Sequence, residues 1–166
     1  HLGIVPGVVV MGKRFGKADF KQLVDLVKKF EKLDEAQIVA FYEAAAKELA
    51  ARLLALVIPR TPVGDYPSSS GKMGGTLRRG WTNNEDMDFH AYAQSLTVTS
   101  TGGGYAIEVI NPVDYAMYVE FGHRTRDHLS WVPGKFMLTI SEEELRDAIP
   151  QILEKKIVTM FKGVFG

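Results

Sequence analysis

The sequence contains no cysteine, carries no net charge and has no long hydrophobic run. The absence of cysteine excludes disulfide bonds, thiolate metal ligands and cysteine nucleophiles, and it leaves the redox compartment undetermined. Twenty basic residues balance twenty acidic ones, so the chain lacks the strong positive charge that drives binding to phosphate backbones. Any contact with nucleic acid would therefore depend on a local patch.

An apolar run near the start, Ile4 to Met11, is too short to span a membrane. Its lysine and arginine follow it, which is the reverse of the order in a signal peptide. We therefore expect a soluble protein made in the cytoplasm, with no membrane partner. Met11 precedes a basic stretch and is a candidate natural initiator, which would make His1 to Val10 a leader or a cloning remnant.

A chain of 166 residues with 46% hydrophobic and 24% charged residues is typical of one soluble globular domain. We expect residues 1–18 to form an N-terminal extension and residues 19–166 to form a single domain. The sequence shows no internal repeat or low-complexity tail that would divide it further.

Two capping signatures predict helices in the first third of the chain. Asp19 is followed by a short amphipathic segment whose apolar residues recur at three- and four-residue intervals up to Phe30. Asp34, with Gln37 three residues later, begins a longer apolar stripe that continues until Pro59 ends it. This second helix is rich in alanine, so other elements can approach its backbone closely.

A third capping signature, Ser141 with Glu144, predicts a C-terminal helix. Glu142 and Glu143 in its first turn suit the positive end of the helix dipole. Pro150 within the apolar stripe predicts a kink or a fresh start at that residue.

The middle of the chain predicts loops and strands. From Pro59 to Thr76, three prolines with several serines and glycines exclude a helix or a central strand, so we expect a long mobile loop. A short strand is expected over Leu77–Trp81, followed by an acidic turn at Asn83–Asp88. Apolar residues alternate with polar ones on both sides of "TSTGGG", which predicts two antiparallel strands.

Tyr115 to Phe121 is too short for periodicity to distinguish a helical turn from a strand, and Gly122 ends it. Together the elements predict an α+β fold, with a small antiparallel sheet packed against long N-terminal and C-terminal helices and with long interaction loops. The predicted core residues are Phe41, Leu49, Leu53, Leu56, Ile107, Val109, Tyr115, Tyr118, Phe121, Leu153 and Ile157.

The stretch "GHRTRDH" at Gly122–His128 gathers histidines, arginines and an aspartate. His123 or His128 with Asp127 would suit a metal site or a small hydrolase. Their five-residue spacing does not place the two histidines on one helix face, and no HExxH motif or carboxylate-rich partner accompanies them. We therefore expect no catalytic residue, no metal and no cofactor.

The same region also has a surplus of positive charge. Arg124, Arg126 and Lys135 outweigh Asp127, and Trp131 is able to stack on a base. Arginine and tryptophan are equally the residues most enriched at protein interface hot spots. Because the whole chain is neutral, we favour a protein partner, and a DNA-binding module is the alternative. The predicted interface residues are Arg78, Arg79, Trp81, His123, Arg124, Arg126, His128, Trp131 and Lys135.

"TPVG" at Thr61–Gly64, followed by "GTLRRGW" at Gly75–Trp81, resembles the TPVDTGxLRxS signature of the HK97 gp10-like family of phage neck and tail-completion proteins. "VDYAMYVEFGHRTR" at Val113–Arg126 resembles that family's second signature, an aromatic run ending in EFG. Order and spacing also match over most of Ala18–Phe161. The family's tight TPVDTG turn is split here by Asp65–Gly74. Its closing PFLxPAL stretch appears as "WVPGKFMLTI", which resembles the branch in contractile-tailed phages and defective prophages of Gram-positive bacteria.

The resemblance implies a structural virion protein without catalysis: a homo-oligomeric ring, taken as a hexamer, that joins the capsid connector to the tail. Its partners would be other copies and other phage neck and tail proteins, with DNA at most passing through the lumen. A neutral chain suits such a lumen, since a strongly basic one would hold the genome back. Its location would be the neck or tail of the virion, and the host cytoplasm during assembly. The loops Arg60–Thr76 and His123–Pro133 would be the contact surfaces.

Overall fold

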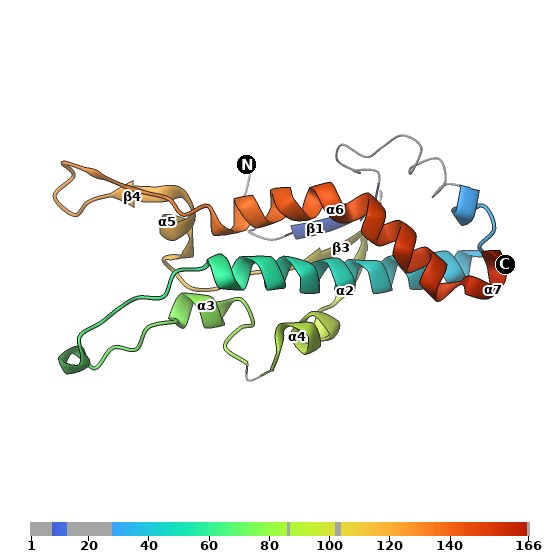
Figure 1. Cartoon of the computed structure of the whole chain (residues 1–166). Coiled ribbons are helices and arrows are strands. Elements are labelled where there is room, and N and C mark those ends of the chain that lie inside the picture. Colours follow the sequence, from blue (N-terminus) through green and yellow to red (C-terminus); the bar gives the residue numbers. More distant parts are fainter. Residues whose placement is uncertain (1–7, 13–27, 86, 102–103, 166) are drawn as a thin grey trace.

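Two long helices form the elongated body of the molecule (Figure 1). They are α2 (Glu35–Arg60) and α6 (Met137–Met160), which pack against each other. Helix α6 changes direction along its course, and it contains Pro150, the residue type that bends helices. The computed structural model describes residues 8–12, 28–85, 87–101 and 104–165.

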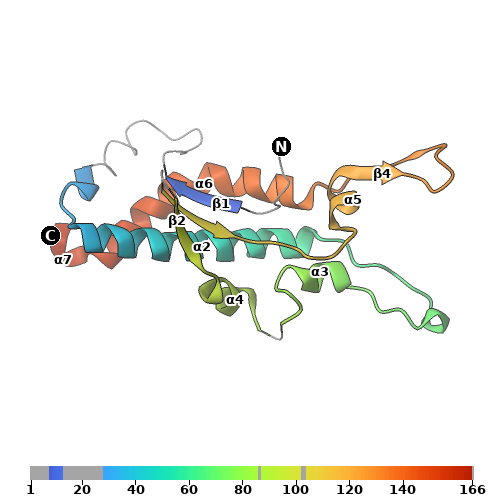
Figure 2. The same cartoon turned by 180° about the vertical axis from the view of Figure 1, so that it is seen from behind.

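A three-stranded antiparallel sheet packs against α2 (Figure 2). Its strands are β1 (Val8–Gly12), β2 (Val98–Thr101) and β3 (Gly104–Glu108), with β3 in the centre. The Tyr105 ring of β3 stacks on Tyr42 of α2, with ring centroids 5.1 Å apart. The α+β class and the strands around "TSTGGG" are confirmed. Strand β1 comes from the expected N-terminal extension, yet it pairs with β3 and belongs to the same sheet.

Helix α2 begins at its predicted cap. Asp34 accepts a hydrogen bond from the Gln37 backbone N–H at 2.8 Å, and the Gln37 side chain accepts one from the Asp34 N–H at 3.0 Å. The helix continues one residue past Pro59, and Thr61 is its C-cap. Of the preceding predicted helix, residues 19–27 lie outside the described residues, while 28–30 are helical.

The strand expected over Leu77–Trp81 is wrong, because Thr76–Gly80 forms a short helix, α3. Leu77 and Trp81 lie four residues apart, so a helical turn places both on one face. Both side chains are buried in the common core. A strand would also place them on one face, but with Arg79 between them, whereas the helical turn leaves Arg79 exposed.

The predicted start of the C-terminal helix at Ser141 is also wrong. Helix α6 begins at Met137, and Ser141 lies buried inside it, where its hydroxyl donates to the Met137 carbonyl at 2.6 Å. A serine that bonds back to the preceding turn cannot cap the helix. Glu142 and Glu143 consequently lie beyond the first turn.

The remaining elements are short. The acidic turn contains Asp88, whose carboxylate caps α4 by accepting from the Ala91 N–H at 2.9 Å. The aromatic run, which the sequence left open between helix and strand, is helical and ends at Gly122. The remaining short elements are η1 (Ser68–Ser70), α4 (Phe89–Ser95), α5 (Ala116–Phe121), β4 (Gly122–Arg124), β5 (Trp131–Pro133) and α7 (Lys162–Phe165).

The core lies between α2, α6, the sheet and α4. Most of the residues expected there are buried, and Leu56 is half-buried against them. Three are not core residues: Tyr115, Tyr118 and Phe121 expose 43%, 59% and 42% of their surface. Helix α5 is only one and a half turns long, and its buried positions are taken by Ala116 and Glu120. The buried predicted residues are Phe41, Leu49, Leu53, Ile107, Val109, Leu153 and Ile157.

Candidate protein-protein interface

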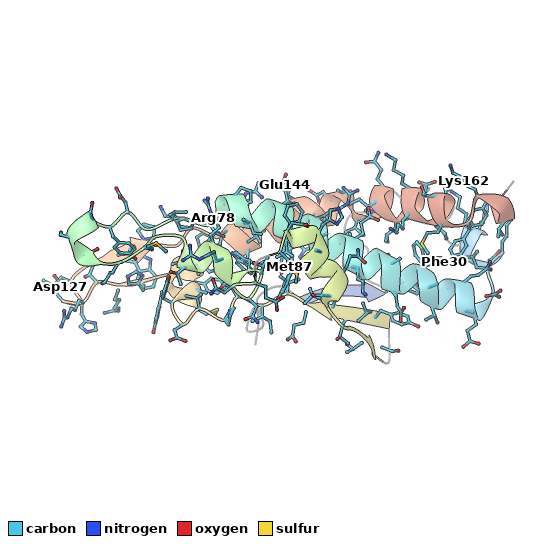
Figure 3. All side chains as sticks on the ribbon, turned by 90° about the horizontal axis from the view of Figure 1, so that it is seen from below. Phe30, Arg78, Met87, Asp127, Glu144 and Lys162 are labelled. Carbon is cyan, nitrogen blue, oxygen red and sulfur yellow. The ribbon has the colours of Figure 1, made fainter. Side chains whose placement is uncertain are left out.

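Two segments project from the same end of the molecule (Figures 1 and 2). The first is residues 61–75, between α2 and α3, which we call the proline loop. The second is residues 122–134, formed by β4, β5 and their connection, which we call the hairpin. Figure 3 shows Asp127 of the hairpin at this extreme and Lys162 near the opposite one. These projections correspond to the two loops that the sequence predicts as contact surfaces.

Large apolar side chains are exposed at this end. In the hairpin, Leu129 and Trp131 expose 85% and 58% of their surface, and in the proline loop Met73 exposes 77%. A contiguous patch of exposed apolar surface is a feature of interaction sites. The others on these projections and on adjoining α5 are Val63, Tyr66, Tyr115, Met117, Tyr118, Phe121 and Val132.

The base of the hairpin is held by close backbone contacts. The Lys135 N–H donates to the Val119 carbonyl at 2.8 Å, and the Phe136 N–H donates to the Glu120 carbonyl at 3.0 Å. Gly134 lies so close that a Cβ there would be 2.3 Å from the Glu120 carbonyl oxygen. The hairpin therefore leaves α5 and returns to it at a fixed place.

The Glu120 carboxylate joins this base to α6. It accepts hydrogen bonds from the backbone N–H groups of Leu138 and Thr139, both at 2.9 Å, and from the Thr139 hydroxyl at 2.7 Å. It thereby acts as the missing cap of α6, whose own preceding residue, Phe136, makes no side-chain cap. Burial raises the pKa of the nearby Glu142, with the charge of Glu120 adding to the rise and Arg146 opposing it.

Gly122 is required where α5 turns into β4. Its φ is 84°, and a Cβ would lie 2.4 Å from the Val132 carbonyl oxygen. We expect Gly122→Ala to lower the free energy of unfolding by about 3 kcal/mol, because strain and a backbone clash add. Gly71→Ala is the matched control, with a φ of 66° but nothing within 4 Å of the added Cβ. Gly71→Ala should lower the free energy of unfolding, measured by urea unfolding, by about 1 kcal/mol. Equal losses in the Gly122 and Gly71 variants would contradict the special role of Gly122.

The tip of the hairpin is a defined turn. The His128 N–H donates to the Thr125 carbonyl at 2.9 Å, and His128 has a φ of 60°. Asp127 accepts from the Thr125 hydroxyl and, at 3.1 Å, from the Leu129 N–H. These two hydrogen bonds hold the pKa of Asp127 below its usual range. Asp127 thus has a structural role in positioning Leu129.

The base of the proline loop is held by a buried network. The Trp81 indole N–H donates to the Thr61 hydroxyl at 2.7 Å, which in turn donates to the Val57 carbonyl at 2.7 Å. The Arg78 guanidinium donates to the Thr61 carbonyl at 2.7 Å and to the Pro59 carbonyl at 3.3 Å. The two ends of the loop are therefore tied together by Thr61, Arg78 and Trp81, which all belong to the first family-like signature.

Thr61→Val tests this network. The substitution keeps the shape but leaves the buried indole N–H of Trp81 without an acceptor, so unfolding should require about 1–3 kcal/mol less free energy. Thr61→Ser restores the hydroxyl and should lose less than half as much. Urea unfolding followed by circular dichroism measures both, and equal losses for Val and Ser would show that the hydroxyl is unimportant.

The structure separates the predicted interface residues into two groups. Trp81 is 1% exposed and belongs to the core. It is therefore not the surface residue that the sequence analysis predicted. Arg78 is half-buried and bound to carbonyl groups, while Arg79 is exposed beside the proline loop and donates to the Gly74 carbonyl at 3.2 Å. Of the predicted interface residues on or beside the hairpin, His123 is half-buried. The exposed ones are Arg124, Arg126, His128, Trp131 and Lys135.

Sequence reasoning missed Glu120, Thr61, Leu129 and Met73. Glu120 is a single carboxylate within an aromatic run, a pattern that signals a buried group with partners. Leu129 and Met73 are isolated large apolar residues within loops of polar residues and glycine, where they have no local partner. Such residues are candidates for contacts made outside the chain.

His123, Asp127 and His128, which the sequence offers as a metal site only as the disfavoured alternative, lie on the hairpin. Within the described residues, no three His, Asp or Glu side chains gather closely enough to hold a metal ion. His123 lies against Tyr118, with ring centroids 5.8 Å apart, and its Nδ1 is buried without a hydrogen-bond partner. Among the described helices, none has both the length and the apolar character needed to cross a membrane.

These features define an α+β domain whose two most exposed large apolar residues, Leu129 and Met73, lie on two anchored projections. The chain matches the model of the HK97-gp10-like family, described as "Bacteriophage HK97-gp10, putative tail-component", over residues 25–122, more than half of its length. It therefore belongs to this family of phage tail components. The matched range ends at Gly122, so the hairpin tip and α6 lie beyond it. No curated protein and no solved structure matches the chain.

Proposed function

We propose that this protein is a structural component of the phage head-tail junction, a neck or tail-completion protein that assembles as a hexameric ring between the capsid connector and the tail. One observation carries this proposal: the two most exposed large apolar side chains, Leu129 and Met73, lie on two projections whose bases are held by hydrogen bonds, and others lie beside them on the projections and α5. A segment anchored in this way keeps its shape before binding, which reduces the entropy lost on association. Family membership in the phage tail components supports the same role.

Repetition explains how modest contacts suffice. In a closed ring each copy offers the same two projections to its neighbours, so weak contacts add up by avidity. The protein would reside in the neck or tail of the virion after assembly in the host cytoplasm. The closing stretch "WVPGKFMLTI" supports a contractile-tailed phage or a related defective prophage as the source. A neutral chain around the lumen would let DNA pass.

A phage or prophage deleted for the gene tests the proposal. We expect DNA-filled heads and complete tails to accumulate unjoined, and purified protein added to the lysate to restore joined particles. Electron microscopy counts the two populations. Joined and infectious particles formed without the protein would contradict a role at the junction.

A DNA-binding module is the second candidate, because Arg124 and Arg126 are exposed and Trp131 is free to stack on a base. Retention on DNA that weakens steeply with salt would favour this function, as phosphate contacts release counterions. The head-tail role predicts no such retention, and the balanced charge of the chain supports that expectation.

A further inference from the structure

A hollow at the base of the proline loop is open to solvent. It has a volume of about 220 Å³ and lies between the proline loop, α3 and α5. Small-molecule sites usually measure about 300–1,000 Å³, so the hollow suits an inserted side chain better than a ligand. Its apolar lining includes Val63, Tyr66, Met73, Leu77, Tyr115 and Val119.

The hairpin of the same chain offers a side chain of matching character. Leu129 is 85% exposed, the highest value among the large apolar residues described. The bond from its N–H to Asp127 fixes its backbone at the tip. It is therefore presented in advance, as binding residues at preorganised interfaces are.

The hairpin does not fill the hollow of its own chain. Both projections leave the body at the same end and remain apart (Figure 1). The contacts of Gly122 and Gly134 with neighbouring backbone fix the direction of the hairpin. Filling the hollow with Leu129 therefore requires a second copy of the chain.

Charges favour such a contact. Arg124 and Arg126 flank the tip of the hairpin, while Asp65 and Asp114 each adjoin a residue that lines the hollow. Within the described part of the chain, none of these four forms an ion pair. Two positive charges also lie near the hollow: Lys72 is over the Tyr66 ring, 5.8 Å from its centroid, and Arg79 is held by the Gly74 carbonyl at 3.2 Å. Opposite charges on the two surfaces would orient one copy against the next.

We propose that Leu129 of one copy inserts into the hollow of the next, with Arg124 and Arg126 facing Asp65 and Asp114. The contact joins two different surfaces, so it repeats head to tail and closes into a ring when the rotation permits. This inference rests on the proposed ring and identifies the partner of the hairpin. All hairpins would then lie on one rim of the ring.

Disulfide trapping tests the contact, because the natural chain has no cysteine. Leu129→Cys and Met73→Cys are purified separately, one with an added tag that changes its mass, and then mixed and oxidised. A mixed disulfide dimer should be the main product. Leu129→Cys mixed with Val158→Cys, on the exposed surface of α6, is the matched control and should give little mixed product.

The outcomes separate the two proposals. Rings that form without the mixed dimer would overturn the docking contact and leave the ring intact. A protein that never self-associates would contradict the ring and the contact together. A double variant, Leu129→Cys with Met73→Cys, that closes its disulfide within one chain would show that the hairpin reaches its own hollow. As a second test, Leu129→Asp should abolish self-association, while Leu129→Met should retain it.

Discussion

Replacing Glu120 with alanine is expected to lower the free energy of unfolding by about 3 kcal/mol. The carboxylate accepts three hydrogen bonds at the start of α6, and its loss leaves the buried N–H of Leu138 and the N–H of Thr139 without an acceptor. In a chain of this length the change corresponds to a Tm lower by about 6–12 °C. Differential scanning calorimetry measures it.

Glu143→Ala is the matched control, because Glu143 is an exposed glutamate of α6 that makes no side-chain hydrogen bond among those described. It should change stability by less than about 0.5 kcal/mol. Glu120→Gln keeps one carbonyl oxygen as an acceptor and should fall between the two. If Glu120→Ala were as stable as the control, the carboxylate could not be the cap of α6.

Combining Arg124→Glu with Trp131→Ala is expected to leave the fold intact and to abolish assembly. Both side chains are exposed on the hairpin, and neither belongs to the hydrophobic core cluster. Arginine and tryptophan at hot spots contribute about 2 kcal/mol each, so the pair should weaken association about 1,000-fold. Circular dichroism tests the fold, and complementation of a deletion phage tests assembly.

The matched control is Lys155→Glu with Val158→Ala, which reverses one charge and truncates one exposed apolar residue on α6. This variant should assemble as the natural protein does. Full infectivity of the hairpin variant would show that the hairpin is not an interface, whereas loss in both variants would point to a general effect of charge.

The sequence predicts the elements whose signals are local. The capping box of Asp34 and the apolar stripe of α2 need no distant partner, and the structure has both. The strand predicted over Leu77–Trp81 and the helix start at Ser141 are wrong because distant contacts decide them. The Trp81 indole N–H donates to the hydroxyl of Thr61, which lies 20 residues earlier, and the Glu120 carboxylate caps α6.

The candidate interface is predictable in part for the same reason. The composition of the loops indicates contact surfaces, but the sequence cannot show that both project from one end of the molecule. It also cannot separate Trp81 from Trp131. One is buried beside Thr61, and the other is exposed on a hairpin, a difference that depends on packing with α2.

Fluorescence quenching tests most directly whether the exposed end is covered by another protein chain. The chain has two tryptophans, and Trp81 is already buried, so acrylamide quenching of the dilute protein reports mainly on Trp131. As the protein assembles, with its mass followed by light scattering, we predict that this quenching is lost and that the emission shifts to the blue. Assembled protein in which Trp131 remains as accessible to acrylamide as in the monomer would contradict the account.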